Sequence, residues 1–254
     1  MRLVRAVLAL LVAPALLAGC GSPRAGHEGR RTVTVFAAAS LTGVFTELGA
    51  AFEAANPGVA VRFNFGSSAT LAQQIVQGAP ADVFAAANPA TMRTVTDASL
   101  AGPPAVFARN RLQIAVPEGN PAGITGLRDL ADPRLKVALC APQVPCGAAA
   151  TAVLAAAGAE VTPVTLEQDV KATLTKLELG EVDAALVYRT DVLASGGGVE
   201  GVDVPEAGEA VNDYPIAVLR DAPAGEPAER FAALVRSPRG GEALARAGFE
   251  VPRA

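Results

Sequence analysis

Residues 32–71 read TVTVFAAASLTGVFTELGAAFEAANPGVAVRFNFGSSATL, and their pattern is the strongest indication of the fold class. The apolar run over 32–38 predicts a strand, and apolar residues then recur at helical spacing over 41–55. An Asn-Pro-Gly turn ends this helix, 59–65 alternates as a second strand, and a second helix follows over 69–77. This order predicts a parallel sheet that is covered by helices on both faces.

The rest of the chain continues as strands and helices without an internal repeat. We expect strands over 81–86, 111–117, 136–140, 161–165, 184–188, 202–204 and 214–219, and helices over 148–157, 170–179, 227–235 and 240–247. An irregular stretch precedes residue 111, and a turn occupies 196–201. The pattern therefore contains two α/β units, with crossovers near residues 111 and 214.

Four junctions place small or polar residues where a strand ends and a helix begins. They are Ala37-Ala38-Ala39-Ser40, Gly66-Ser67-Ser68-Ala69-Thr70, Val144-Pro145-Cys146-Gly147 and Glu167-Gln168-Asp169-Val170. The first N–H groups of a helix have no acceptor within the helix and carry the positive end of its dipole. Four such ends that face one point would hold a small dianion without any Lys or Arg.

Each junction also has an ordinary structural explanation, because Ser and Asp are common helix N-caps. Ser40 and the Ser67–Ser68 pair, however, follow adjacent strands of one predicted sheet, so their hydroxyls should reach the same edge. Tyr188 ends a buried strand and needs a partner for its phenol, which a core carbonyl could also provide. The convergence of the serines favours a binding site, whereas Asp82, just before a strand, is expected to be structural.

Composition excludes several classes of protein. The chain has 254 residues, a net charge of −4 and no basic stripe for a nucleic acid. Its only histidine, His27, precedes the predicted fold, so no Ser-His-Asp or Cys-His catalytic arrangement is available. No zinc-type cluster or Walker-type sequence occurs, and the glycines at 196, 198 and 201 are expected to form a surface turn. We expect no enzyme activity, no cofactor and no metal bound directly by side chains.

The N-terminal residues are typical of a secretion signal. A basic start and an apolar run over 4–17, too short to span a bilayer well, precede Leu-Ala-Gly-Cys at 17–20. This tetrapeptide resembles a bacterial lipobox, which implies cleavage before Cys20 and its acylation; an ordinary cleaved signal is the alternative. We expect 1–19 to be a lipoprotein signal peptide and 20–31 the lipidated cysteine and linker. The mature protein would then lie outside the cytoplasmic membrane, anchored by its lipid.

Cys140 and Cys146 are the remaining cysteines. An extracytoplasmic compartment permits disulfides, and the intervening residues, two of them prolines, could form a small stiff loop. Metal binding is the rival interpretation, but no histidine lies nearby in the sequence. We expect a disulfide, and two free buried thiols are the alternative.

The sequence resembles the periplasmic molybdate-binding proteins of ABC transporters over nearly all of 32–252. The resemblance is carried by these segments: Val35 to Thr42, Gly66 to Ala72, Gly78 to Phe84, Asp169-Val170, Leu186-Val187-Tyr188 and the final Gly248-Phe249. It implies a type II periplasmic-binding fold, with two lobes whose mostly parallel sheets are flanked by helices. Lobe I would comprise 32–110 and 215–254, and lobe II 111–214.

The resemblance also implies the ligand contacts. Hydroxyls of Ser40, Ser68 and Tyr188 and backbone N–H groups of Cys146 and Val170 would hold molybdate or tungstate. The protein would deliver the anion to an ABC permease with its ATPase subunit and act as a monomer. The alternatives are a receptor for sulfate, thiosulfate or phosphate, a ferric-iron receptor, a secreted α/β enzyme such as an esterase, and a structural lipoprotein.

Overall fold

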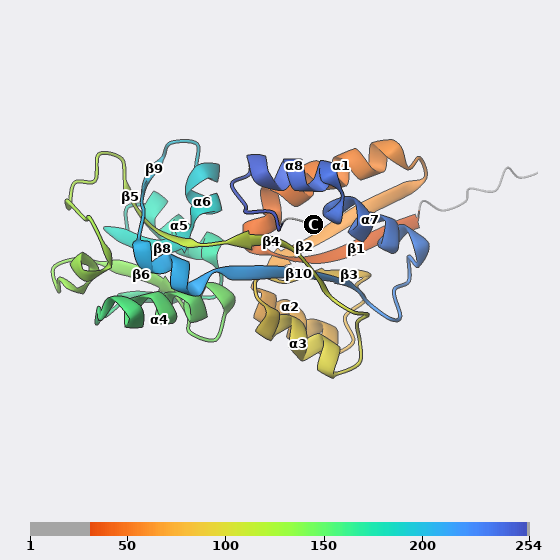
Figure 1. Ribbon diagram of the computed structural model, residues 1–254, viewed down its shortest axis with the longest axis horizontal. Helices are drawn as coiled ribbons and strands as arrows, with labels where there is room; N and C mark the ends of the chain where they lie inside the picture. Colours follow the sequence, from red (N-terminus) through yellow and green to blue (C-terminus); the bar gives the residue numbers. More distant parts are fainter. Residues whose placement is uncertain (1–30, 253–254) are drawn as a thin grey trace, which may run out of the picture.

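The computed structural model describes residues 31–252 and contains two five-stranded sheets, each flanked by helices (Figure 1). The strand order is β2-β1-β3-β10-β4 in the first sheet and β7-β6-β8-β5-β9 in the second. We call the first sheet with its helices lobe I and the second sheet with its helices lobe II. The predicted two-lobed α/β fold is confirmed.

Lobe I begins with the two strand–helix units that open the sequence. Its elements are β1 (Arg31–Ala38), η1 (Ala39–Leu41), α1 (Thr42–Ala55), β2 (Val59–Gly66), α2 (Ser68–Val76), β3 (Val83–Ala85), α3 (Pro89–Asp97), β4 (Ala105–Asn110), β10 (Asn212–Val218), α7 (Glu226–Arg236) and α8 (Pro238–Arg246). Helices α1, α7 and α8 cover one face of the sheet, and α2 and α3 cover the other (Figure 1). Because both faces are buried, β1 is continuously apolar and buried over residues 35–38, and it alternates only in its first half.

Lobe II repeats the plan around a single core. Its elements are β5 (Leu112–Pro117), η2 (Leu127–Ala131), β6 (Val137–Cys140), α4 (Pro145–Ala157), β7 (Thr165–Glu167), α5 (Val170–Glu178), β8 (Ala184–Tyr188), α6 (Arg189–Ala194), β9 (Val199–Val202) and η3 (Pro205–Ala210). Apolar side chains of α4 and α5 pack with those of β5, β6 and β8 in this core. Strands β6 and β8 run parallel, so the loops that follow them leave from the same edge of the sheet.

The two lobes are joined by two crossovers. The chain leaves lobe I after β4 and enters β5 at Leu112, and it returns through η3 into β10 at Asn212. Asn110 and Asn212 are paired residues of β4 and β10, so the two crossovers lie side by side. Since β10 already pairs with lobe I at Asn212, we propose 31–110 and 212–252 as the extent of lobe I.

Several elements differ from the sequence predictions. Both sheets are evenly mixed and not mostly parallel: β4 and β10 in lobe I, and β5 with its two neighbours in lobe II, pair antiparallel. The supposedly irregular stretch contains α3 and β4, and α6 was also not predicted. The strand expected over 161–165 was wrong, because β7 starts at Thr165, after Pro163, which has no N–H for a ladder.

Candidate functional site

A small cavity lies between the two lobes, and all five residues named by the resemblance line it. These are Ser40 and Ser68 from lobe I and Cys146, Val170 and Tyr188 from lobe II. The cavity measures about 20 Å³. This is far below the roughly 300 Å³ at the lower end of pockets for organic ligands. The cavity therefore suits a compact ion and excludes a sugar phosphate or a peptide.

The lobe I wall is built from the loops that follow β1 and β2. These strands are parallel neighbours, with Ala38 opposite Gly66, so both loops start at the same sheet edge. The chain after β1 turns into η1, which contains Ser40, and the chain after β2 enters α2 at Ser68. The strand register thus brings the two predicted serines together.

Each of these two hydroxyls has a protein partner that restricts where its proton can point. Ser40 Oγ lies 2.9 Å from the Tyr214 hydroxyl, and Ser68 Oγ accepts a hydrogen bond of 3.0 Å from Ala87 N–H. Because Ser68 Oγ accepts this bond, its own proton remains available for a ligand. Ser67 also lines the cavity, and its buried Oγ has no hydrogen-bond partner in the described structure. Three hydroxyls of lobe I thus stand at the cavity.

The lobe II wall presents the starts of two helices. Pro145 is the first residue of α4 and has no N–H, so Cys146 supplies the first peptide N–H of that helix. Val170 is the first residue of α5, and the preceding Asp169 caps the helix by accepting a bond of 3.0 Å from Ala172 N–H. The cap does not use the Val170 N–H, which can face an anion as predicted.

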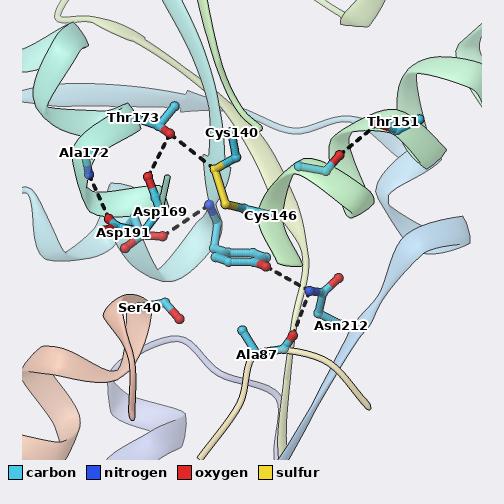
Figure 2. The surroundings of a disulfide bond; sticks show 12 residues. Ser40, Ala87, Cys140, Cys146, Thr151, Asp169, Ala172, Thr173, Asp191 and Asn212 are labelled. Carbon is cyan, nitrogen blue, oxygen red and sulfur yellow. Dashed lines mark hydrogen bonds between the residues drawn. A yellow bond between two sulfur atoms is a disulfide. The ribbon is translucent and has the colours of Figure 1, made fainter. Parts of the chain in front are cut away.

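A disulfide between Cys140 and Cys146 ties the end of β6 to the start of α4, with their Cα atoms 5.7 Å apart (Figure 2). The loop within it is tightly packed. A Cβ atom on Gly147 would lie only 1.9 Å from the Ala141 carbonyl oxygen. Only glycine permits this close approach, and the backbone that carries the Cys146 N–H is therefore fixed on both sides.

Tyr188 ends β8 and is buried, and its hydroxyl accepts a hydrogen bond of 2.8 Å from the side chain of Asn212. Burial raises the pKa of Tyr188 well above its ordinary value, and burial likewise raises the pKa of Tyr214. Both phenols therefore keep their protons at neutral pH and can act only as neutral donors or acceptors.

Charge at the site is arranged without a cation in the lining. Among residues 31–252, no Lys, Arg or His lines the cavity, and Asp169 is the charged residue that does. Asp191 lies behind Tyr188, accepts its backbone N–H at 3.3 Å, and stands 3.0 Å from Lys171 Nζ. Burial raises the pKa of Asp191, and the neighbouring Lys171 opposes this shift. Any anion here would be held by dipoles and hydrogen bonds.

Other predicted features have structural roles or lie outside the described residues. Asp82 accepts N–H groups of Thr34 and Ala224, each at 2.7 Å, and so joins two segments of lobe I. Gly196 and Gly198 lie in a turn that leads into β9, as expected, but Gly201 lies within β9, which occupies Val199–Val202 and not the predicted 202–204. The strand-to-helix order of a dinucleotide site does not occur at these glycines. Cys20, His27, the signal peptide and the linker up to residue 30 lie outside the described part.

Within 31–252, no helix is both long and apolar enough to cross a membrane. The same part of the chain contains no group of three or more His, Cys, Asp or Glu side chains that could hold a metal ion.

Tyr214 and Asn212 belong to the site but were not predicted from the sequence. The sequence predicts only a crossover near residue 214, but Tyr214 is buried beside Tyr188 and its hydroxyl is hydrogen-bonded to that of Ser40. One signal was available, since these are the only two tyrosines of the chain. Asn212 carried no comparable signal, because its position depends on the pairing of β10 with β4.

Comparison with known proteins gives a consistent result. Residues 33–250 match the family model described as bacterial extracellular solute-binding protein. The chain is 43% identical over 251 residues to the molybdate-binding protein ModA of Mycobacterium tuberculosis (strain ATCC 25618 / H37Rv), covering 97% of this chain and 96% of that protein.

Solved structures show the same fold. The Azotobacter vinelandii periplasmic molybdate-binding protein matches with a TM-score of 0.75 at 22% identity, covering 87% of this chain and 100% of that chain. The sulfate-binding protein SubI from Mycobacterium tuberculosis H37Rv matches with a TM-score of 0.76 at 19% identity, covering 87% of each chain. These two neighbours are named for different oxyanions, so the fold alone does not select the ligand.

Proposed function

The chain belongs to the bacterial extracellular solute-binding proteins, and on this premise we propose that it captures molybdate or tungstate for an ABC transporter. The observation that carries this proposal is the convergence of neutral donors from both lobes on one small cavity. The identity of 43% to a molybdate-binding protein over almost the full length supports molybdate among the oxyanions.

The chemistry of the donors favours a fully deprotonated oxyanion. Hydroxyl and peptide N–H groups can all donate to an anion that has no proton of its own to give. Hydrogen phosphate would also need an acceptor, and among residues 31–252 Asp169 is the only carboxylate in the lining. An unpaired carboxylate opposite a dianion would repel it, and this one already caps α5. Sulfate meets the same donor pattern as molybdate, so the two must be separated by cavity size.

The proposed ligand groups come from both lobes. Lobe I would provide the hydroxyls of Ser40 and Ser68, to which we add the unpartnered hydroxyl of Ser67. Lobe II would provide the Cys146 and Val170 N–H groups and the Tyr188 hydroxyl. Because only the closed arrangement brings all donors to one point, the anion stabilises closure of the lobes.

The setting follows from the family and from the sequence. The family is extracellular, and we propose that acylated Cys20 anchors the protein to the outer face of the cell membrane. As a monomer it would hand the anion to a permease that is driven by its ATPase subunit. The family binds solutes for transport and is not a family of enzymes.

Thermal unfolding of the full chain in mild detergent tests the proposal, with molybdate, tungstate, sulfate and phosphate added separately. A ligand that binds only the folded state raises the melting temperature with the logarithm of its concentration over its Kd. We expect a large shift with molybdate and tungstate and none with phosphate. A shift with sulfate alone would replace the ligand, and no shift with any oxyanion would overturn the function.

A further inference from the structure

Asn212 bridges the two lobes directly behind the cavity. It is 7% exposed and stands at the start of β10. Its Nδ2 atom donates to the Ala87 carbonyl of lobe I at 2.8 Å and to the Tyr188 hydroxyl of lobe II at 2.8 Å. Figure 2 shows the side chain of Asn212 beside Ala87, with these bonds drawn. One amide nitrogen thus contacts both sides of the site.

The orientation of this amide is determined by its surroundings. A backbone carbonyl oxygen can only accept a hydrogen bond, so the atom of Asn212 that faces Ala87 must be the nitrogen. The same nitrogen faces the Tyr188 hydroxyl, and its two hydrogens are used by these two acceptors. An amide nitrogen accepts no hydrogen bond, so Tyr188 cannot donate its proton back to Asn212.

The Tyr188 hydroxyl therefore accepts a hydrogen bond from Asn212 and must donate its own proton elsewhere. Resting on the proposed function, we infer that Asn212 is a positioning residue that turns the O–H of Tyr188 into the cavity, toward the bound oxyanion. The phenol accepts a hydrogen bond from Asn212, so its own proton is left for another acceptor, and a bound oxyanion would compete for that proton with the neighbouring Tyr214 hydroxyl. Without this bond, the same O–H could turn to any nearby acceptor, and Tyr188 would enter binding with an unoriented donor.

The bridge also belongs to the crossover region. Asn212 pairs with Asn110 across β4 and β10, and Asn110 donates to Thr190 Oγ1 of lobe II at 2.8 Å. Asn212 thus lies at the crossover between the lobes, paired with Asn110. Because Asn110 itself bonds lobe II, its position depends on how the two lobes are placed relative to each other. Orientation of the Tyr188 proton is consequently linked to the closed arrangement of the two lobes.

A double-mutant cycle on the full chain tests the inference, with molybdate affinity measured by titration calorimetry. In the parent, Asn212→Ala should raise the Kd for molybdate about tenfold, the size expected for a hydrogen bond to a charged group. In a Tyr188→Phe background, the same substitution should change the Kd by less than about threefold, because no O–H remains to be oriented. Equal fold-changes in the two backgrounds would overturn the inference.

Two further variants separate positioning from general destabilisation. Asn120→Ala removes a lobe II amide that bonds Ile124 at 2.7 Å, far from the cavity lining, and should lower the melting temperature without changing the Kd. Asn212→Asp keeps the size of the side chain but replaces donor hydrogens with an acceptor, and should weaken binding more than Asn212→Ala does.

The outcomes distinguish the two proposals. A parent that binds no oxyanion overturns both the function and the inference. A parent that binds molybdate, together with Asn212 variants that fold and bind it equally well, overturns the inference alone. If Asn212→Ala fails to fold, Asn212→Asp measured in the parent and in the Tyr188→Phe background gives the same decision, because repulsion of the anion acts in both backgrounds and only the loss of positioning differs.

Discussion

The two walls of the cavity use different kinds of donor. Lobe I presents side-chain hydroxyls from Ser40, Ser67 and Ser68, whereas lobe II presents peptide N–H groups at the starts of α4 and α5 together with one phenol. A hydroxyl rotates about its C–O bond, so a protein partner is needed to restrict it, as at Ser40 and Ser68 but not at Ser67. A peptide N–H is fixed to its backbone, so it must be aimed by the backbone itself.

The supporting contacts follow this difference. In lobe I, Tyr214 contacts the Ser40 hydroxyl and Ala87 N–H donates to Ser68. In lobe II, a disulfide, a proline at the first helical position and the tight Gly147 hold the backbone of α4 in place. Substitutions in lobe I should therefore act by loss of single bonds, and substitutions in lobe II by displacement of the wall.

The largest effect is expected from Gly147→Ala. The added Cβ would lie 1.9 Å from the Ala141 carbonyl oxygen, so the backbone carrying the Cys146 N–H must move. A misplacement of about 1 Å in such a site can cost about 100-fold, and we expect molybdate affinity to fall by that order. Calorimetric titration would measure it.

Gly43→Ala is the matched control in lobe I. A Cβ at this position of α1 meets nothing within 4 Å, and replacing a helical glycine by alanine should stabilise the protein by about 0.5–1 kcal/mol. Normal molybdate binding by Gly147→Ala would show that the lobe II wall does not depend on a fixed backbone.

The serine pair provides the next largest effect. Ser68→Ala should weaken binding by roughly 1.5–3 kcal/mol and also lower the melting temperature without ligand, because Ala87 N–H loses its acceptor. Ser67→Ala should weaken binding within the same range but leave the ligand-free melting temperature unchanged, since its Oγ has no partner to lose. Calorimetry and thermal unfolding of both variants measure the difference. Unchanged binding by Ser67→Ala would remove Ser67 from the ligand groups.

Removal of the disulfide should affect stability more than binding. Replacing both Cys140 and Cys146 by Ala should lower the free energy of unfolding by about 2 kcal/mol, the loop-closure value for a short loop. The Cys146 N–H remains, so the affinity should fall by no more than about tenfold through weaker preorganisation. Denaturant unfolding measures the first effect, and the parent under reducing conditions should match the variant. An unchanged free energy of unfolding would contradict the role assigned to this bond.

The sequence alone was sufficient to predict the bounds of the long, regularly patterned elements. The elements that open lobe I follow their predicted bounds closely, because 41–55 is long and strongly periodic and a turn ends it. Short segments were less predictable. The Asn88-Pro89 start of α3 was overlooked, although Asn88 caps the helix by accepting Thr91 N–H at 2.8 Å.

The residues of the site likewise fall into those that could be predicted from the sequence and those that could not. Ser40 and Ser68 could be named from the sequence because their hydroxyls follow two adjacent strands. The groups that contact them could not, because these contacts depend on the tertiary fold: Ser40 and Tyr214 are 174 residues apart, and the Ala87 N–H that donates to Ser68 comes from the next strand–helix unit, 19 residues away. The helix starts that carry the backbone donors could be predicted from the sequence, but the choice of the Cys146 N–H came from the resemblance, because a backbone donor is independent of side-chain type.

The smallest expected effect concerns Asp191, a buried carboxyl group that lies behind the lobe II wall of the cavity. Asp191 follows β8 and accepts Tyr188 N–H, whereas the buried Asp82 of lobe I lies before β3, at the other end of the strand. Burial raises the pKa of Asp191 above the ordinary value of 3.8, so the folded state holds this proton more tightly than the unfolded state. Its contribution to stability therefore falls as the pH rises from 3.8 through the raised pKa.

Asp191→Asn keeps a neutral group at this position and should abolish that fall. The free energy of unfolding of the parent relative to this variant should decline with pH above 3.8 and then become constant.

Asp132→Asn is the control of opposite sign, because hydrogen bonds from Arg134 lower the pKa of Asp132 to about 2. The stabilisation by Asp132 is present above 3.8 and is lost as the pH falls toward 2. Denaturant unfolding across this range measures both differences. A parent-to-variant difference for Asp191 that rises with pH would mean that the Lys171 ion pair outweighs burial beneath the lobe II wall.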